Sequence, residues 1–153
     1  MRFVLKLALF SLLLTACSEE PSVEQQVIAT LRNMEFAAED GDHFDFISYV
    51  SDTFSGQQGS MGRRDFHRFM IFQINQNRRL QAQLFPIFVT ETGENAATAN
   101  FRILVTGGGG LLPDRGRFFQ VETEWSGANG DWLLEAADWK PLDLPVPQLP
   151  GDT

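Results

Sequence analysis

Apolar residues recur every three or four positions between Ser22 and Asn77, which is the spacing of helices with one buried face. A first helix is predicted from Ser22 to about Glu39. Ser22 and Gln25 have the spacing of a capping box, and Gly41 can supply the left-handed stop. The apolar face of this helix consists of Val23, Val27, Leu31, Met34 and Ala38.

Two further helices are predicted in the same segment. Asp42 can cap the second helix, and Asp45 in its first turn is favoured by the helix dipole. The apolar positions of this second helix are Phe44, Ile47 and Val50. After a Gly-rich break at residues 56–62, the third helix begins near Arg63, with a stripe of Phe66, Phe69, Met70, Gln73 and Ile74.

The period of the pattern changes to two from Leu80 onward, which predicts strands at residues 80–90, 97–106, 119–125 and 132–139. Pro86 interrupts the first strand, so the sheet should bend there or place that strand at an edge. On the second strand Phe101 and Ile103 alternate with Asn100 and Arg102. This alternation predicts one apolar and one polar sheet face.

The register of the last predicted strand stays open, because both of its faces are apolar enough to be buried. Asp138 shares a face with Trp132 and Leu134 in a regular strand. If the strand pairs one residue off, Glu135 and Trp139 turn inward instead. In either register the sequence predicts an α+β domain over residues 22–142, with three N-terminal helices on a curved four-stranded antiparallel sheet.

The first 16 residues follow the plan of a secretory leader, with Arg2 and Lys6 before a short apolar run at residues 7–14. The sequence LTAC at residues 14–17 resembles the lipobox of bacterial lipoproteins. This resemblance implies cleavage before Cys17, diacylation of its thiol and attachment to a membrane, with residues 17–21 as a tether. Ser18, in place of Asp, implies the periplasmic face of the outer membrane. The alternative is an ordinary cleaved signal with an incidental cysteine.

Chain length limits the number of domains, and net charge limits the class of binding partner. The 153 residues, with 43% hydrophobic content, suffice for one domain with a sizeable core. A formal net charge of −8 disfavours nucleic acid, which demands clustered Lys and Arg. Residues 143–153 form a proline-spaced tail that we expect to be extended.

The arrangement of predicted elements resembles the nuclear transport factor 2-like superfamily, which includes the SnoaL-like polyketide cyclases and ketosteroid isomerase. The resemblance rests on EDGD at residues 39–42, GRRDF at residues 62–66 and NGDWLL at residues 129–134, in that order and spacing. It implies a cone-shaped fold with a ligand pocket at the mouth, and an outer sheet face that can serve a homodimer. The positions that carry catalytic groups in the isomerases fall near Met34, near Gln58 or Gly59, and near Val121, none of which supplies an acid or base.

Candidate site residues follow from this cone. The side chains expected to line the pocket are Met34, Phe66, Met70, Phe101, Val121 and Trp125. His67 and Asp138 could form an acid–base pair inside the cone, as in the histidine–carboxylate sites of related dehydratases. The competing interpretation is a partly exposed helical histidine and an aspartate at a strand end. No metal site has a recognisable ligand spacing and no cofactor is indicated.

Two functions are compatible with this sequence. The first is a noncatalytic binding domain, anchored by lipid at Cys17 to the bacterial cell envelope, that presents an apolar cone to a small ligand or a protein partner. The second is a small-molecule isomerase, dehydratase or hydrolase that uses His67 and Asp138. The content of the pocket separates them, since the binding domain should have at most one titratable side chain there.

Overall fold

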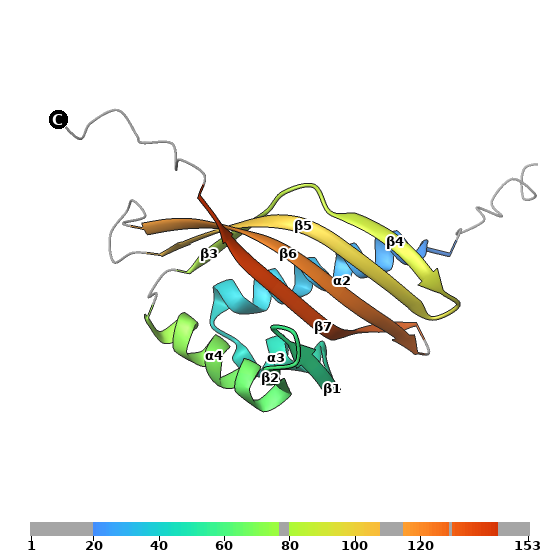
Figure 1. Ribbon diagram of the computed structural model, residues 1–153, viewed down its shortest axis with the longest axis horizontal. Coiled ribbons are helices and arrows are strands. Elements are labelled where there is room, and N and C mark those ends of the chain that lie inside the picture. The colour runs from blue at the N-terminus through green and yellow to red at the C-terminus, as the bar shows by residue number, and fades with distance from the viewer. Residues whose placement is uncertain (1–19, 77–79, 108–114, 129, 144–153) are drawn as a thin grey trace, which may run out of the picture.

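The computed structural model describes residues 20–76, 80–107, 115–128 and 130–143 (Figure 1). The predicted signal peptide, Cys17 and the tail beyond Asp143 lie outside these residues. Three helices, α2 (Val23–Asp40), α3 (His43–Ser48) and α4 (Arg63–Gln76), accompany one sheet. No helix in this described part is both long and apolar enough to cross a membrane.

The helix boundaries follow the local signals in the sequence. The Ser22 side chain accepts from the N–H of Gln25, and the Gln25 side chain accepts from the N–H of Ser22, which completes the predicted capping box. Gly41 ends α2 with φ 79°, a conformation that favours glycine. Asp42 caps α3 by accepting from the N–H groups of Phe44 and Asp45. These predicted caps are confirmed.

The sheet contains seven strands in the order β2-β1-β7-β6-β5-β3, with β4 also paired to β5. All pairs are antiparallel except β1 with β7, which is parallel. The strands are β1 (Val50–Gly56), β2 (Met61–Gly62), β3 (Gln81–Leu84), β4 (Phe88–Gly93), β5 (Ala96–Gly107), β6 (Arg115–Ala128) and β7 (Asp131–Leu142).

The prediction of four antiparallel strands was therefore wrong in number and in direction. Val50, assigned to the second helix, instead begins β1, in which Val50 and Phe54 are buried. Helix α3 ends at Ser48, and at this end Arg63 donates to the carbonyls of Ile47 and Val50. The first predicted strand is divided into β3 and β4, and the predicted interruption at Pro86 is confirmed.

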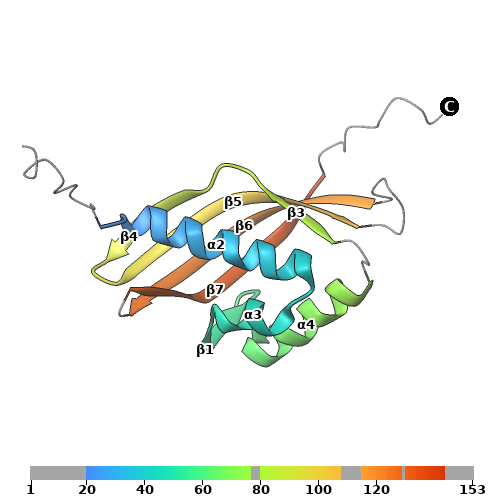
Figure 2. The same cartoon turned by 180° about the vertical axis from the view of Figure 1, so that it is seen from behind.

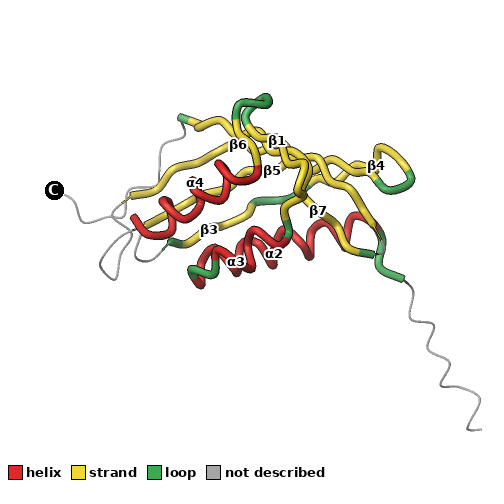
Figure 3. Tube along the Cα trace, turned by 90° about the horizontal axis from the view of Figure 1, so that it is seen from below, coloured by secondary structure: helices red, strands yellow, loops and turns green. Residues whose placement is uncertain are grey.

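Helix α2 lies along the concave face of the sheet, with α3 and α4 beside it next to β1 (Figures 2 and 3). The core lies between these helices and the inner sides of β5, β6 and β7. Phe66 of α4 stacks on Phe54 of β1 with ring centroids 4.7 Å apart, and contacts Trp139 of β7 at 5.8 Å. Burial of one such phenylalanine contributes roughly 1.5–3 kcal/mol to folding.

Strand β7 carries one extra residue relative to β6. Trp125 pairs with Leu134 and Glu124 pairs with Ala136, so Glu135 has no partner and forms a β-bulge. Beyond the bulge the alternation shifts by one position. Trp139 consequently joins Leu134 on the concave face.

Candidate functional site

The concave face of the sheet is lined almost entirely by apolar side chains. Its members are Ala97, Ala99, Phe101, Ile103 and Val105 of β5, Val121, Thr123 and Trp125 of β6, and Trp132, Leu134, Ala137 and Trp139 of β7. Those near the end of the sheet where β5 leaves and β6 returns remain partly exposed: Ile103, Val105, Val121 and Trp139. Phe69 of α4 stacks on Trp139 there, with ring centroids 5.6 Å apart. An apolar molecule could reach this partly exposed end.

The six residues predicted to line a pocket all belong to the apolar core between the helices and the concave face of the sheet, or pack against it. Met34, Phe66, Phe101 and Trp125 are buried in the core. Met70 and Val121 are partly buried and pack against it. The two less buried residues are therefore the ones that could meet a ligand from outside.

The one polar side chain among these strand residues of the concave face is Thr123, and its hydroxyl is already engaged. Thr123 Oγ1 donates to the carbonyl of Ala99 at 3.0 Å and accepts from Trp125 Nε1 at 2.8 Å. Trp132 Nε1 donates to the side-chain oxygen of Gln26 at 3.0 Å. These bonds satisfy the buried polar atoms, so they hold the core together and leave no acid or base.

The acids Glu122, Glu124 and Asp138 of β6 and β7 lie on the opposite, convex face, whereas the exposed Glu91 of β4 pairs with Ala97 of the concave face at the edge of the sheet. Asp138 pairs across the ladder with Glu122, and both side chains are exposed. Asp138 Oδ1 accepts from the backbone N–H of Gln58 at 2.7 Å, in the turn between β1 and β2. The bulge at Glu135 is the reason, because it turns Asp138 away from the face that holds Trp132 and Leu134.

His67 does not pair with Asp138 in this structure. Its Nε2 atom lies 3.0 Å from Nδ1 of His43, at the contact between α3 and α4. The pKa of His67 is lowered, first by burial and then by the positive charges of His43 and Arg63. The predicted acid–base pair is thus divided between the helices and the convex face.

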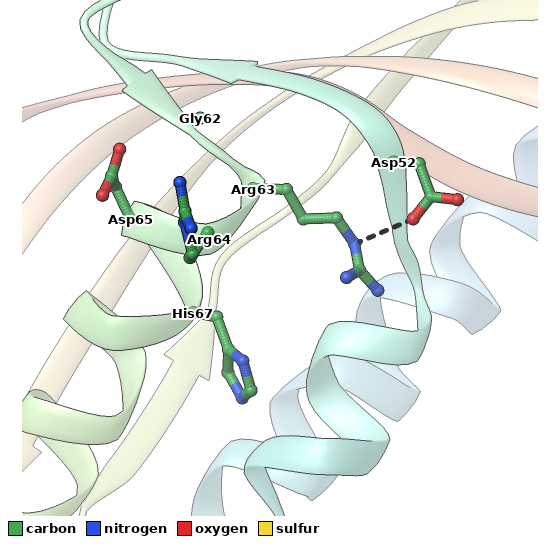
Figure 4. A pocket seen from close by; sticks show the side chains of 6 residues that line it. All are labelled: Asp52, Gly62, Arg63, Arg64, Asp65 and His67. Carbon is green, nitrogen blue, oxygen red and sulfur yellow. Dashed lines mark ion pairs between the residues drawn. The ribbon is translucent and has the colours of Figure 1, made fainter.

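A shallow hollow of about 530 Å³ adjoins this histidine contact, lined by Asp52, Gly62, Arg63, Arg64, Asp65 and His67 (Figure 4). Arg63 extends from the start of α4 toward Asp52 on β1, with Nε 3.6 Å from Oδ1. Its guanidinium also donates to the carbonyls of Ile47 and Val50. Arg63 therefore joins α4 to α3 and β1 through its Nε and Nη2 donors.

Sequence reasoning missed the partner of His67. The ring of His43 contacts both Phe44 and His67, with ring centroids 4.2 and 5.1 Å apart. The two histidines are 24 residues apart, and the unpredicted β1–β2 hairpin between them brings α4 back onto α3. Among the described residues, no group of three or more His, Cys, Asp or Glu side chains is arranged to hold a metal ion.

Comparison with known proteins bears on the fold alone. The sequence matches no protein-family model and no curated protein. Bd1075 of Bdellovibrio bacteriovorus has a similar structure, with a TM-score of 0.65 and 8% identity over 77% of this chain. The match covers 41% of Bd1075, so this chain spans about two fifths of that protein's length.

Two solved structures match over most of both chains. A proposed dehydratase of the NTF2-like family from Streptomyces avermitilis has a TM-score of 0.66 and 17% identity, over 78% of this chain and 96% of its own. A proposed scytalone dehydratase from Novosphingobium aromaticivorans has a TM-score of 0.65 and 9% identity, over 78% and 83%. With helices packed on the concave face of a strongly curved sheet, the chain has the nuclear transport factor 2-like α+β fold.

Proposed function

We propose that this protein is a noncatalytic binding domain for a small apolar ligand, held at the bacterial cell envelope by a lipid on Cys17. The observation that carries the binding half is the division of the sheet. On β5, β6 and β7 the concave face has apolar side chains and one hydrogen-bonded threonine, whereas the acids Glu122, Glu124 and Asp138 are on the convex face. Proton transfer requires a donor and an acceptor at the bound substrate, and the concave side of these three strands offers neither.

The proposed ligand contacts are the partly buried apolar residues at one end of this face. Val121 pairs with Trp139 of β7 on one side and with Phe101 of β5 on the other, so neighbouring strands flank it on the concave face. Phe69 stacks on Trp139 from α4 and provides a second aromatic surface. Flat or flexible uncharged molecules fit this chemistry, because a charged group there would lose hydration without gaining a partner.

Adjacent residues on opposite faces of β6 give a matched test. The full chain is purified with a detergent that is kept below the critical micelle concentration. It is then titrated with the uncharged fluorescent probe N-phenyl-1-naphthylamine. Val121→Gln places an amide on the concave face and should weaken probe binding about tenfold, since an unpaired buried amide costs on the order of 1–3 kcal/mol. Glu122→Gln changes the convex face and should leave binding unchanged. If the two variants bind the probe with equal affinity, or if neither binds it, the assignment of the site to the concave face is refuted.

The anchoring half of the proposal rests on the leader and the LTAC sequence at residues 14–17. It is tested separately in bacterial cells. Mass spectrometry of the mature protein should find acyl chains on Cys17, and Cys17→Ser should release the protein from the membrane fraction. A mature wild-type chain that starts elsewhere or lacks acyl groups would refute the anchor without affecting the binding domain.

A further inference from the structure

The contact between α3 and α4 brings together all the imidazoles of this protein. The chain contains 2 histidines among its 153 residues, and the fold places them side by side. His43 Nδ1 and His67 Nε2 are 3.0 Å apart, and the two rings are tilted by 46°. Neither residue has a part in the proposed apolar site on the concave face.

We propose that His43 and His67 form a two-imidazole site for a divalent transition-metal ion, with Cu(II), Ni(II) and Zn(II) as the chemical class. Imidazole nitrogen is a preferred ligand of these ions. Nitrogens bound at about 2.0–2.1 Å with an angle between 90° and the tetrahedral value lie about 2.9–3.4 Å apart. The observed separation is within this range, so the two donors are already placed and binding requires a rotation of the rings.

The surroundings fix the donors and leave room for the ion. Asp42 caps α3 next to His43 by accepting from two backbone N–H groups, which holds the first turn in place. Both histidines are partly exposed, so an ion can enter from solvent. The exposed ring of Phe44 lies over the pair, with its centroid 4.2 Å from that of His43 and 6.0 Å from that of His67.

Protons and charges at the contact are compatible with coordination. Two neutral imidazoles joined by a hydrogen bond have one ring N–H between them. When an ion binds, that proton moves to the remote nitrogen of its own ring, so both facing nitrogens present lone pairs. The nearby Arg63 opposes a cation, but its guanidinium is held on two carbonyls and lies 3.6 Å from the carboxylate of Asp52.

The described residues supply no third histidine or carboxylate arranged with this pair. Water must therefore complete the coordination shell, as it does at open sites. We expect an exchangeable ion and not a permanent structural one. Because its two ligands come from different helices, the bound ion would also brace α3 against α4.

The experiment uses the full chain without a polyhistidine tag, titrated with CuCl₂ and ZnCl₂. Any signature of two imidazoles must come from His43 and His67, since the sequence has no other. We expect electron paramagnetic resonance of the Cu(II) form to show coupling to two imidazole nitrogens. Isothermal titration should give at least tenfold weaker zinc binding for both His43→Gln and His67→Gln.

A further measurement keeps the test decisive if a variant does not fold. In the wild-type chain, zinc should shift the proton resonances of both histidine rings together in nuclear magnetic resonance spectra. A shift of one ring alone, coupling to a single nitrogen, or equal affinity of wild type and both folded variants would overturn the proposal. Val121→Gln, which alters the concave face, should retain the metal affinity of wild type.

Discussion

The turn between β1 and β2 holds two glutamines in a backbone conformation that residues with a Cβ rarely adopt. Gln57 has φ 50° and Gln58 has φ 57°, and the N–H of Gly59 donates to the carbonyl of Gly56. Two successive positive φ values at the centre of such a turn describe type I′, which favours Asn and Gly. The left-handed conformation costs about 1–2 kcal/mol for each of these residues.

We therefore expect Gln58→Gly to stabilise the protein. The side chain of Gln58 is exposed and makes no hydrogen bond in the described structure, while its backbone N–H still donates to Asp138. Relief of the left-handed conformation should add about 1–2 kcal/mol to the free energy of unfolding. The greater freedom of glycine in the unfolded chain should lower that free energy by about 0.4–1 kcal/mol. A net gain of about 0.5–1 kcal/mol should raise the midpoint of thermal unfolding by about 2–6 °C.

Gln57→Gly is the matched control for this prediction. It relieves the same conformation one residue earlier, but it removes the hydrogen bond from Gln57 Nε2 to the carbonyl of Trp139, 3.1 Å long. That bond is worth about 0.5–1.5 kcal/mol, so the net change should be close to zero or destabilising. Urea unfolding followed by tryptophan fluorescence measures both variants. A loss of stability in Gln58→Gly, or equal gains in the two variants, would refute the reasoning.

Three further predictions concern the sheet and the first helix. Burial raises the pKa of Glu135, but hydroxyl donors from Ser126, Thr53 and Ser51 outweigh burial, and the net pKa is lowered. The stability that Glu135 adds is therefore present above about pH 4.3 and lost as the pH falls. In acid titrations followed by circular dichroism, Glu135→Gln should flatten the loss of stability between about pH 5 and 3. Gly127→Ala would place a Cβ 2.9 Å from the Trp132 ring and should cost about 1–3 kcal/mol in urea unfolding. Ser22→Ala removes a helix cap and should cost about 1 kcal/mol in the same assay.

Local rules predicted the helices well because their caps are encoded by neighbouring residues. Ser22, Gly41 and Asp42 act within a few positions of themselves, and each has the role that its side chain predicts. The edge of the sheet could not be found in this way. Strand β1 is stabilised by its parallel pairing with β7, some 80 residues further along the chain, and the local sequence carries no sign of that partner.

The last strand did carry a signal that pointed to its irregular register. Trp132 and Trp139 are seven residues apart, and residues at an odd separation face opposite sides of a regular strand. Both are large apolar side chains, so burial of both requires one extra residue between them. Glu135 is that residue, and the side-chain oxygens that hold it come from Ser126 and Thr53, which the sequence alone does not bring near.

The same bulge has a consequence for function. Had β7 run regularly, Asp138 would share the concave face with Trp132 and Leu134, and a carboxylate would lie among the aromatic rings. Dehydration requires a base to take a proton and an acid to assist the leaving group. Turnover at the centre of this sheet would therefore need groups that β6 and β7 keep on the outside, whereas binding needs only the apolar surface that the fold must build for its own stability.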